Sequence, residues 1–456
     1  MSAARRFSKA SSPTSRRSSG AVSVVVALWA GIAGCRRVAS QESAPAIDEP
    51  STQGDAQDAA PTGNAPRELS ARCPKGGRPI ALGDAGSQGE IEIGDTLEYD
   101  RGLAVGFAIR EGAKRTAGVA LLEPEATGAA KIIELGPVVD DAPAPLLARR
   151  SGDLLAAVFG VPPGRAHGGG DRELTIYAVG SDHADSLTSF DKPTDDSMAI
   201  GVASDGPDAF VVWDEASRAR GGVVRGAPVT SRAVKAVVRD ISPPESDAED
   251  PRIVVDGAGY SVIWIARSPE APTWVDAAEV TGVARSFGWL QRVEIDPLGA
   301  VRGPASDLTP RSGHVSAYDA RMFAATGELV VVARDDGEAI DGSGGALLRV
   351  RARGAAIEPV QSVAVDGVGH GAPAFVDGKP PWLSWMGHDE QLRLLPLDAA
   401  GLPSGLPSSE GALSEARPLA VMASPSEATG HWLVATPTDP AGPLRLVECA
   451  PPRGLQ

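Results

Sequence analysis

Two histidines and a run of acids are the residues whose types best suit metal or ligand chemistry. His314 and His370 lie in the segments SGHVSAY and VGHGAPA, each just before an apolar run, so both are expected on one rim of neighbouring structural units. Asp335, Asp336 and Asp341 follow in the segment DDGEAID. Imidazole nitrogens and carboxylate oxygens are common metal ligands, and carboxylates suit calcium. These five residues are the candidates for a metal site, and the alternative is that they cap or solvate loops.

A second acidic segment, residues 245–251 (ESDAEDP), also carries carboxylates close enough together to hold a hard divalent cation. Neither acidic segment has the ligand spacing of an EF-hand loop, and solvated hairpin tips commonly have this composition. The sequence therefore predicts no cofactor, with calcium as the one alternative.

The common catalytic signatures are missing from the sequence. It contains no CxxC, HExxH or GxSxG motif, no P-loop, and no GxGxxG after a strand. The Ser-x-Asp-x-Gly-x-Thr-Trp box of sialidase-like propellers is also absent. An enzyme is therefore not expected, although a site assembled from distant residues leaves no such motif.

The first 34 residues have the features of an export signal. A basic leader without acids precedes an apolar core at residues 21–33, which is too short to cross a membrane as a helix. The segment Ile32-Ala33-Gly34-Cys35 resembles the lipobox of bacterial lipoproteins. That resemblance implies removal of residues 1–34, lipidation (diacylation, palmitate included) of Cys35 as the first mature residue, and a membrane anchor. The alternatives are an ordinary secreted protein or an uncleaved anchor.

The chain is acidic, with a formal charge of −16. Residues 1–34 carry five positive charges and no negative ones, so their removal would bring the charge to −21. Phosphate backbones repel a protein with such a charge, so nucleic acid is not an expected partner.

Composition divides the remaining chain into three parts. Residues 35–70 are rich in Ser, Pro, Ala, Gln and acids with scattered apolar residues, which predicts a disordered tether. Residues 71–452 contain short apolar runs, many of them β-branched, between Gly, Pro, Asp and Ser turns, which predicts an all-β domain. Residues 453–456 are a short C-terminal tail.

A hairpin-like unit recurs along the all-β domain. The clearest copies pair two apolar runs across a tight turn. They are residues 198–213, 252–264, 321–332 and 373–385. The second run of each unit begins near residues 102, 153, 208, 260, 328, 381 and 430. Seven such units of three or four strands predict a β-propeller with seven blades, and six or eight blades are the alternatives.

The two ends of this domain are expected to meet. Residues 444–449 (LRLVEC) would be a late strand of the last blade, and residues 73–82 (CPKGGRPIAL) would add the outer strand beside it, closing the propeller. With Cys35 lipidated, Cys73 and Cys449 remain, and an oxidising compartment would let them form a disulfide bond across this seam. Two unpaired thiols are the alternative.

Four tryptophans stand at similar positions in the repeated unit: Trp213, Trp264, Trp385 and Trp432. Repeated aromatic residues sometimes line a sugar-binding surface, but their large apolar area also stabilises contacts between blades. We expect packing between blades.

From the signal region onward the chain resembles bacterial β-propeller lipoproteins in its general organisation, without the motif of a subfamily. The resemblance implies a non-enzymatic binding or interaction module of the cell envelope, anchored at the outer membrane, with a protein or glycan partner. Two alternatives are a glycan-acting hydrolase or lyase with a site at the channel mouth, and an envelope scaffold that docks a cationic partner. Two convergent buried carboxylates, or a tyrosine beside a carboxylate, would favour the enzyme.

Overall fold

The apolar runs of the sequence form antiparallel strands in a computed structural model, and every described residue belongs to one compact unit, residues 64–456. The structure describes residues 78–80, 90–99, 102–122, 130–140, 142–161, 172–192, 198–217, 221–230, 236–257, 259–269, 286–337, 345–365, 367–376, 381–389, 391–410, 421–423, 431–435 and 444–449. Among these residues no segment is helical, and none could span a membrane as a helix.

Six sheets, numbered here as blades in chain order, are each built from consecutive strands. Blade 1 contains β2 (Glu90–Tyr99), β3 (Gly102–Glu111), β4 (Lys114–Leu122) and β5 (Lys131–Pro137). Blade 2 contains β6 (Leu146–Arg150), β7 (Asp153–Gly160), β8 (Arg172–Val179) and β9 (Ala184–Lys192). Blade 3 contains β10 (Ile200–Asp205), β11 (Asp208–Ser217), β12 (Gly221–Pro228) and β13 (Arg239–Asp240).

The next three blades follow the same order. Blade 4 contains β14 (Asp247–Asp256), β15 (Gly259–Pro269), β16 (Ser286–Ile295) and β17 (Ser306–Asp307). Blade 5 contains β18 (Val315–Phe323), β19 (Glu328–Asp335), β20 (Ala346–Arg353), β21 (Ala356–Ile357) and β22 (Gln361–Ser362). Blade 6 contains β23 (Ala374–Val376), β24 (Trp382–Met386), β25 (Leu392–Pro396) and β26 (Ser408–Glu410).

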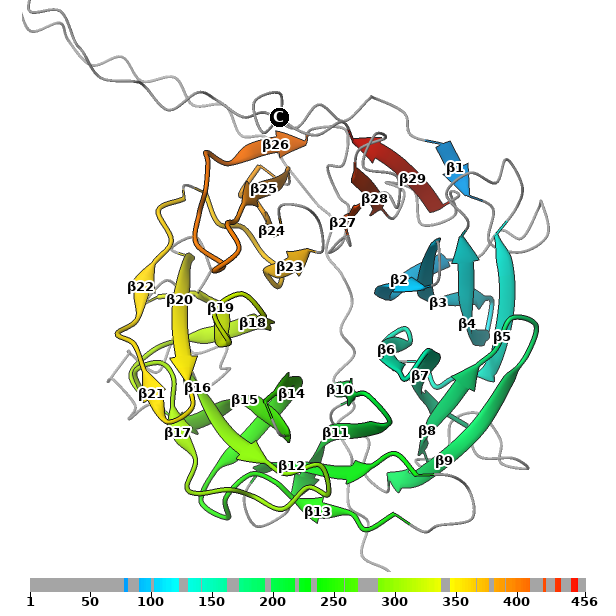
Figure 1. Ribbon diagram of the computed structural model, residues 1–456, viewed down its shortest axis with the longest axis horizontal. Coiled ribbons are helices and arrows are strands. Elements are labelled where there is room, and N and C mark those ends of the chain that lie inside the picture. The colour runs from blue at the N-terminus through cyan, green and yellow to red at the C-terminus, as the bar shows by residue number, and fades with distance from the viewer. Residues whose placement is uncertain are drawn as a thin grey trace, which may run out of the picture. The chain divides into compact units, whose positions relative to one another are not determined.

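The first strand of each blade is its innermost strand. β2, β6, β10, β14, β18 and β23 contact one another in this order around a common centre, and the later strands lie progressively farther out (Figure 1). This is the arrangement of a β-propeller, so the prediction of a propeller is confirmed.

The hairpins form because local turn chemistry and strand patterning agree. At the turn between β14 and β15, Gly257 has a φ of 59°, which a residue without a side chain adopts at little cost. The strand that follows is almost continuously apolar because both of its faces are covered. Val262 and Trp264 face a core shared with blade 3, and Ile263 and Ile265 face a core shared with blade 5. Successive side chains of a strand point to opposite faces, so one strand joins three blades.

The repeated tryptophans pack between blades, as expected. Trp213 lies in the core shared with blade 2, Trp264 in the core shared with blade 3, and Trp385 in the core shared with blade 5. Each is at most 3% exposed. Burial of a side chain of this size contributes up to about 4 to 6 kcal/mol by area. The side chain of Trp432 lies outside the described residues.

The predicted blade count and closure require a correction. Shared cores of described side chains join six blades, from blade 1 to blade 6. A further four-stranded sheet is described by its backbone only: β1 (Arg78–Ile80), β27 (Val421–Ala423), β28 (His431–Ala435) and β29 (Leu444–Cys449).

In that sheet β1 pairs antiparallel with β29, and Arg78 lies opposite Leu446. A blade seals a propeller only when its two faces pack against both neighbours, and backbone pairing does not supply this packing. Among the described residues the structure thus has six packed blades, not the predicted seven, and closure of the ring by this strand pairing is not shown. Cys73 and the side chain of Cys449 lie outside the described residues.

Candidate functional site

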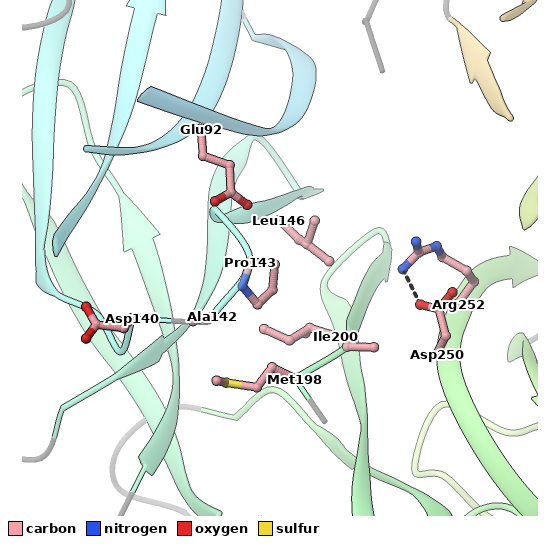
Figure 2. A pocket seen from close by; sticks show the side chains of 10 residues that line it. Glu92, Asp140, Ala142, Pro143, Leu146, Met198, Ile200, Asp250 and Arg252 are labelled. Atoms are coloured by element: carbon pink, nitrogen blue, oxygen red, sulfur yellow. Dashed lines mark ion pairs between the residues drawn. The ribbon is translucent and has the colours of Figure 1, made fainter. Parts of the chain in front are cut away.

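A pocket of about 460 Å³ opens at the inner edge of the propeller, where parts of blades 1 to 4 meet. Ten residues line it: Glu92, Asp140, Ala142, Pro143, Leu146, Met198, Ala199, Ile200, Asp250 and Arg252. The volume lies in the range of pockets that bind small molecules. Figure 2 shows apolar side chains in the middle of the pocket, with Glu92 at one side and the Asp250–Arg252 pair at another.

The apolar wall depends on a close approach between two blades. The connection from β5 to β6 carries Pro143 and lies against β2, where the amide of Asp95 donates to the carbonyl of Pro145 at 3.0 Å. A Cβ atom on Gly94 would lie 2.2 Å from that carbonyl oxygen, so glycine is required there. This approach places Leu146 beside Met198 and Ile200 at the start of blade 3 (Figure 2).

A buried arginine orients Glu92. Arg115 is 3% exposed, and its Nη2 lies 2.6 Å from Oε2 of Glu92. Its Nη1 donates to the carbonyls of Val139 at 3.0 Å and Asp140 at 3.1 Å, and also to the carbonyl of Ala142. One guanidinium therefore holds both the pocket acid and the pocket wall, in the multiple-donor geometry that arginine provides.

Asp140 lies at the outer side of the pocket and is also paired. Nη1 of Arg110 lies 3.1 Å from Oδ1 of Asp140, and Nη2 donates to the main-chain carbonyl of the same residue. The carboxylate is far from Arg252 in the view of Figure 2. Asp140 therefore adds negative charge at the edge of the pocket and does not face Arg252 across it.

The opposite side of the pocket is built on a β-bulge in β14. The pairing with β15 shifts between Glu249 and Arg252, and Asp250 has a φ of 50°, a left-handed conformation that Asp tolerates better than most residues. The bulge is held at both ends, because the Asp250 amide donates to Oδ2 of Asp214 at 3.0 Å and its carbonyl accepts from the Tyr318 hydroxyl at 2.7 Å. The bulge turns Arg252 toward the pocket.

Arg252 is the cation of the pocket. Its Nη1 lies 3.4 Å from Oδ1 of Asp250, and its guanidinium lies 6.0 Å from the centre of the Tyr318 ring. Asp250 raises the pKa of Arg252, followed by smaller effects of other groups, among them Asp319 and Asp95, against the opposing effect of burial. The side chain remains 34% exposed, so a fixed positive charge is available to a ligand.

Tyr318 and Asp319 place a tyrosine and a carboxyl group near this cation, but neither has the geometry of a catalytic group. The Tyr318 hydroxyl shares its hydrogen between the carbonyls of Asp250 and Ile263, each at 2.7 Å, and burial raises its pKa well above 10.0. Burial also raises the pKa of Asp319, although the amide of Phe375 donates to its Oδ2 at 2.7 Å. Both groups bind the backbone of a neighbouring blade.

The metal candidates from the sequence are brought near one another only in part. The carboxylate of Asp335 accepts a hydrogen bond from the amide of His314 at 3.2 Å, and the His314 ring stacks on Phe287. Arg334 lies between the other two, with Nη2 at 2.7 Å from Asp336 and 3.3 Å from Nδ1 of His370.

Among the residues that the structure describes, no three His, Cys, Asp or Glu residues are grouped for a metal ion. Asp341 and Cys35 lie outside the described part of the chain.

The acidic segment 245–251 was expected at a hairpin tip, and that expectation is wrong. Residues 247–251 belong to β14, the innermost strand of blade 4. Their acids are used locally, since Asp247 accepts from the amide of Gly222 at 2.5 Å and Glu249 lies 2.7 Å from Nε of Arg267.

Sequence reasoning missed the pocket, since Glu92, Leu146 and Arg252 were not singled out. The signal that could have found one side of it is Pro251 directly before the apolar repeat of residues 252–264, because proline inside a strand marks an edge or a bulge.

No family model matches this chain, and no curated protein matches it. Solved structures are similar at low identity. The β-propeller domain of the Trilobed protease from Pyrococcus furiosus, which has an open velcro topology, is 10% identical, with a TM-score of 0.43 over 80% of this chain and 98% of that chain. Bombyx mori GH32 beta-fructofuranosidase BmSUC1 is 10% identical, with a TM-score of 0.35 over 80% of this chain and 94% of that chain.

A neuraminidase-like protein from A/bat/Guatemala is 11% identical, with a TM-score of 0.40 over 68% of this chain and 89% of that chain. These likenesses concern the propeller fold alone, and we infer no ligand or activity from them.

Proposed function

We propose that the protein is a non-enzymatic binding module that takes a small molecule or the end of a larger ligand in the pocket of blades 1 to 4. One observation carries the proposal: each carboxylate that lines the pocket is paired with an arginine. Glu92 pairs with Arg115, Asp140 with Arg110, and Asp250 with Arg252. A cavity with an apolar wall and a few oriented polar groups is typical of ligand binding.

The glycan-acting hydrolase or lyase is the alternative that this geometry disfavours. Such an enzyme needs a carboxyl group free to exchange a proton with substrate, and commonly a second carboxylate facing it across the scissile bond. Glu92 instead lies 2.6 Å from a buried guanidinium, and the hydroxyl of Tyr318 is used by main-chain carbonyls. The carboxylates and the tyrosine near the channel thus have structural partners that a substrate would have to displace.

We also propose that the module acts at the cell envelope, held by a lipid on Cys35 and a tether of residues 35–70. This part of the proposal rests on the sequence pattern of residues 1–35. Metabolic labelling with a palmitate analogue, compared between the natural chain and Cys35→Ala, tests it. Label retained by the variant would refute lipidation at this cysteine.

A screen that measures capture and turnover on the same glycans and peptides tests the binding function. Ligands are incubated with the purified protein, and both the bound and free fractions are analysed by mass spectrometry. Leu146→Trp fills the pocket from a half-buried position, and Leu187→Trp makes the same change in β9, the outermost strand of the same blade.

The proposal predicts that a captured ligand is recovered intact, that Leu146→Trp abolishes capture, and that Leu187→Trp does not. Products that accumulate with the natural protein and stop with Glu92→Gln would show an enzyme instead. Capture that survives Leu146→Trp would place the binding surface elsewhere.

A further inference from the structure

The three ion pairs of the pocket are unequal. Glu92 and Arg115 approach to 2.6 Å, Asp140 and Arg110 to 3.1 Å, and Asp250 and Arg252 to 3.4 Å. Shorter charge-assisted hydrogen bonds are stronger, so Arg252, whose ion pair is the longest of the three, is the arginine held least tightly by its acid. An ammonium ligand would have to displace a guanidinium from an acid, whereas an anion can add to the free side of Arg252.

The donors of Arg252 also remain available. A guanidinium has five N–H donors, and among the described residues Arg252 forms one ion pair, between Nη1 and Asp250. Among the described residues, no hydrogen bond occupies its Nη2 or Nε. The two N–H groups of an arginine edge match the two oxygens of a carboxylate.

The wall beside this arginine is apolar. Leu146 lies between Glu92 and Arg252 in Figure 2, with Ile200 close to it and with Pro143 and Met198 on the side away from Arg252. The cavity of about 460 Å³ would hold roughly fifteen water molecules at liquid density, so it admits an apolar body of similar size. Burial of that body supplies the hydrophobic part of the affinity.

The acids that line the pocket are balanced by arginines, although the whole chain carries −16. Three acids line the pocket, and three arginines are paired with them, so these six side chains together carry no net charge. Asp319 and Asp95 also act on Arg252 and add negative charge that the contacts of a bound anion must offset. Salt in the medium screens the more distant acids over about 10 Å.

We propose that the pocket selects a small organic anion in which a carboxylate is carried on an apolar body. The carboxylate binds Arg252, and the body lies along Leu146, Met198 and Ile200. Two sources share this chemistry, a medium-chain fatty acid and the C-terminus of a peptide that ends in an apolar residue. The inference rests on the proposed binding function and adds the class of ligand.

Titration calorimetry with defined probes tests the inference. Octanoate, octanol and octylammonium share one apolar body and differ in charge, while N-acetyl-Gly-Gly-Leu and its C-terminal amide, which have no charged amino group, separate the peptide source from the fatty-acid source. We expect octanoate or the free peptide to bind at least roughly tenfold more tightly than its uncharged counterpart, and octylammonium not to bind detectably.

Arg252→Gln should remove that preference by weakening the anion at least roughly tenfold while octanol binding stays unchanged, which also shows that the variant is folded. Arg252→Lys should restore part of the affinity. Arg267→Gln is the matched control, since Arg267 is 29% exposed and pairs with Glu249 on the same strand pair but does not line the pocket.

If charged and neutral probes bind equally well and Leu146→Trp abolishes that binding, the proposed anion selectivity is wrong. The binding function of the pocket would still stand. Anion binding that falls equally in Arg252→Gln and Arg267→Gln would also overturn it. If none of the five probes binds, the ligand class is wrong, and the glycan and peptide screen then decides the binding function separately.

Discussion

Replacing Asp250 with asparagine should strengthen the binding of an anion in the pocket. Asp250 lies 3.4 Å from Arg252 and offsets part of its positive charge. Asparagine has nearly the same shape and tolerates the φ of 50° that the bulge imposes. The amide and carbonyl of residue 250 keep their partners, since both contacts are made by the main chain. The substitution therefore changes the charge and little else.

The size of the effect follows from distance and exposure. A ligand carboxylate bound to Arg252 would lie about 6 Å from the Asp250 carboxylate, where the repulsion is roughly 0.7 kcal/mol in water and about 3 kcal/mol near a protein surface. Asp250 is 33% exposed and Arg252 is 34% exposed, so screening favours the lower part of this range. We expect about 1 kcal/mol, which is roughly a fivefold gain in affinity.

Titration calorimetry with octanoate at low ionic strength measures this gain, and added salt should reduce it. Glu249→Gln is the matched control, because it removes one carboxylate from the same strand, at a position that pairs with Arg267 outside the pocket. An unchanged or weaker affinity for octanoate in Asp250→Asn would refute the reasoning. An equal gain in Glu249→Gln would also refute it, since net charge alone would then explain the effect.

Three further substitutions test the contacts around the pocket and the blades. Tyr318→Phe should lower the free energy of unfolding by about 1 to 2 kcal/mol in urea denaturation, because two buried carbonyls lose their shared donor. Asp319→Asn should become more stable than the natural protein as the pH rises above 3.8, because burial raises the pKa of Asp319 and its charged form costs stability there. Asp307→Asn should show the opposite pH dependence. Burial opposes ionisation of Asp307, but hydrogen bonds from Arg311, Gln291 and Trp289 outweigh it and lower the pKa of this carboxyl group. The natural carboxylate therefore stabilises the fold above pH 3.8, and this stabilisation is lost as the pH falls through the lowered pKa.

The two aspartate variants control for each other, because both remove one negative charge and their expected stability differences have opposite signs. Thermal unfolding measured from acid to neutral pH gives both curves. Parallel curves would contradict the assigned pKa directions. For Tyr318→Phe, an unchanged free energy of unfolding would mean that the hydroxyl does not hold the bulge.

The strands could be predicted from sequence because they depend on local signals. Second runs were expected to begin near residues 102, 153, 208, 260, 328 and 381, and β3, β7, β11, β15, β19 and β24 begin within one residue of these positions. A tight turn followed by an almost continuous apolar run identifies such a strand without reference to the rest of the fold. Packing of the tryptophans between blades followed from their size and repetition.

The number of packed blades could not be predicted from these local signals. Periodicity counts groups of strands, and the last group is present as the sheet of β1, β27, β28 and β29. Whether such a sheet seals the propeller depends on side chains that face both neighbours, which are contacts between distant parts of the chain. A spacing of about fifty residues contains no information on those contacts.

The pocket could not be predicted because its parts are distant in the sequence. Glu92, Leu146, Ile200 and Arg252 come from four blades, and each is separated from the next by about fifty residues. The segment 245–251 was assigned to a loop because acids and a proline are rare in strands. β14 is the edge strand of its sheet and has a bulge at this point, so no neighbouring strand needs a backbone N–H from Pro251. Such a strand tolerates a proline and acidic side chains.

A crystal of the protein with ω-bromooctanoate tests the central claim most directly, because the anomalous signal of bromine locates the ligand without assumptions about its pose. The account predicts a bromine peak beside Leu146 and Ile200, with the carboxylate density at Arg252 and no peak in crystals of Leu146→Trp. A peak outside the pocket, or a ligand whose carboxylate points away from Arg252, would contradict the account.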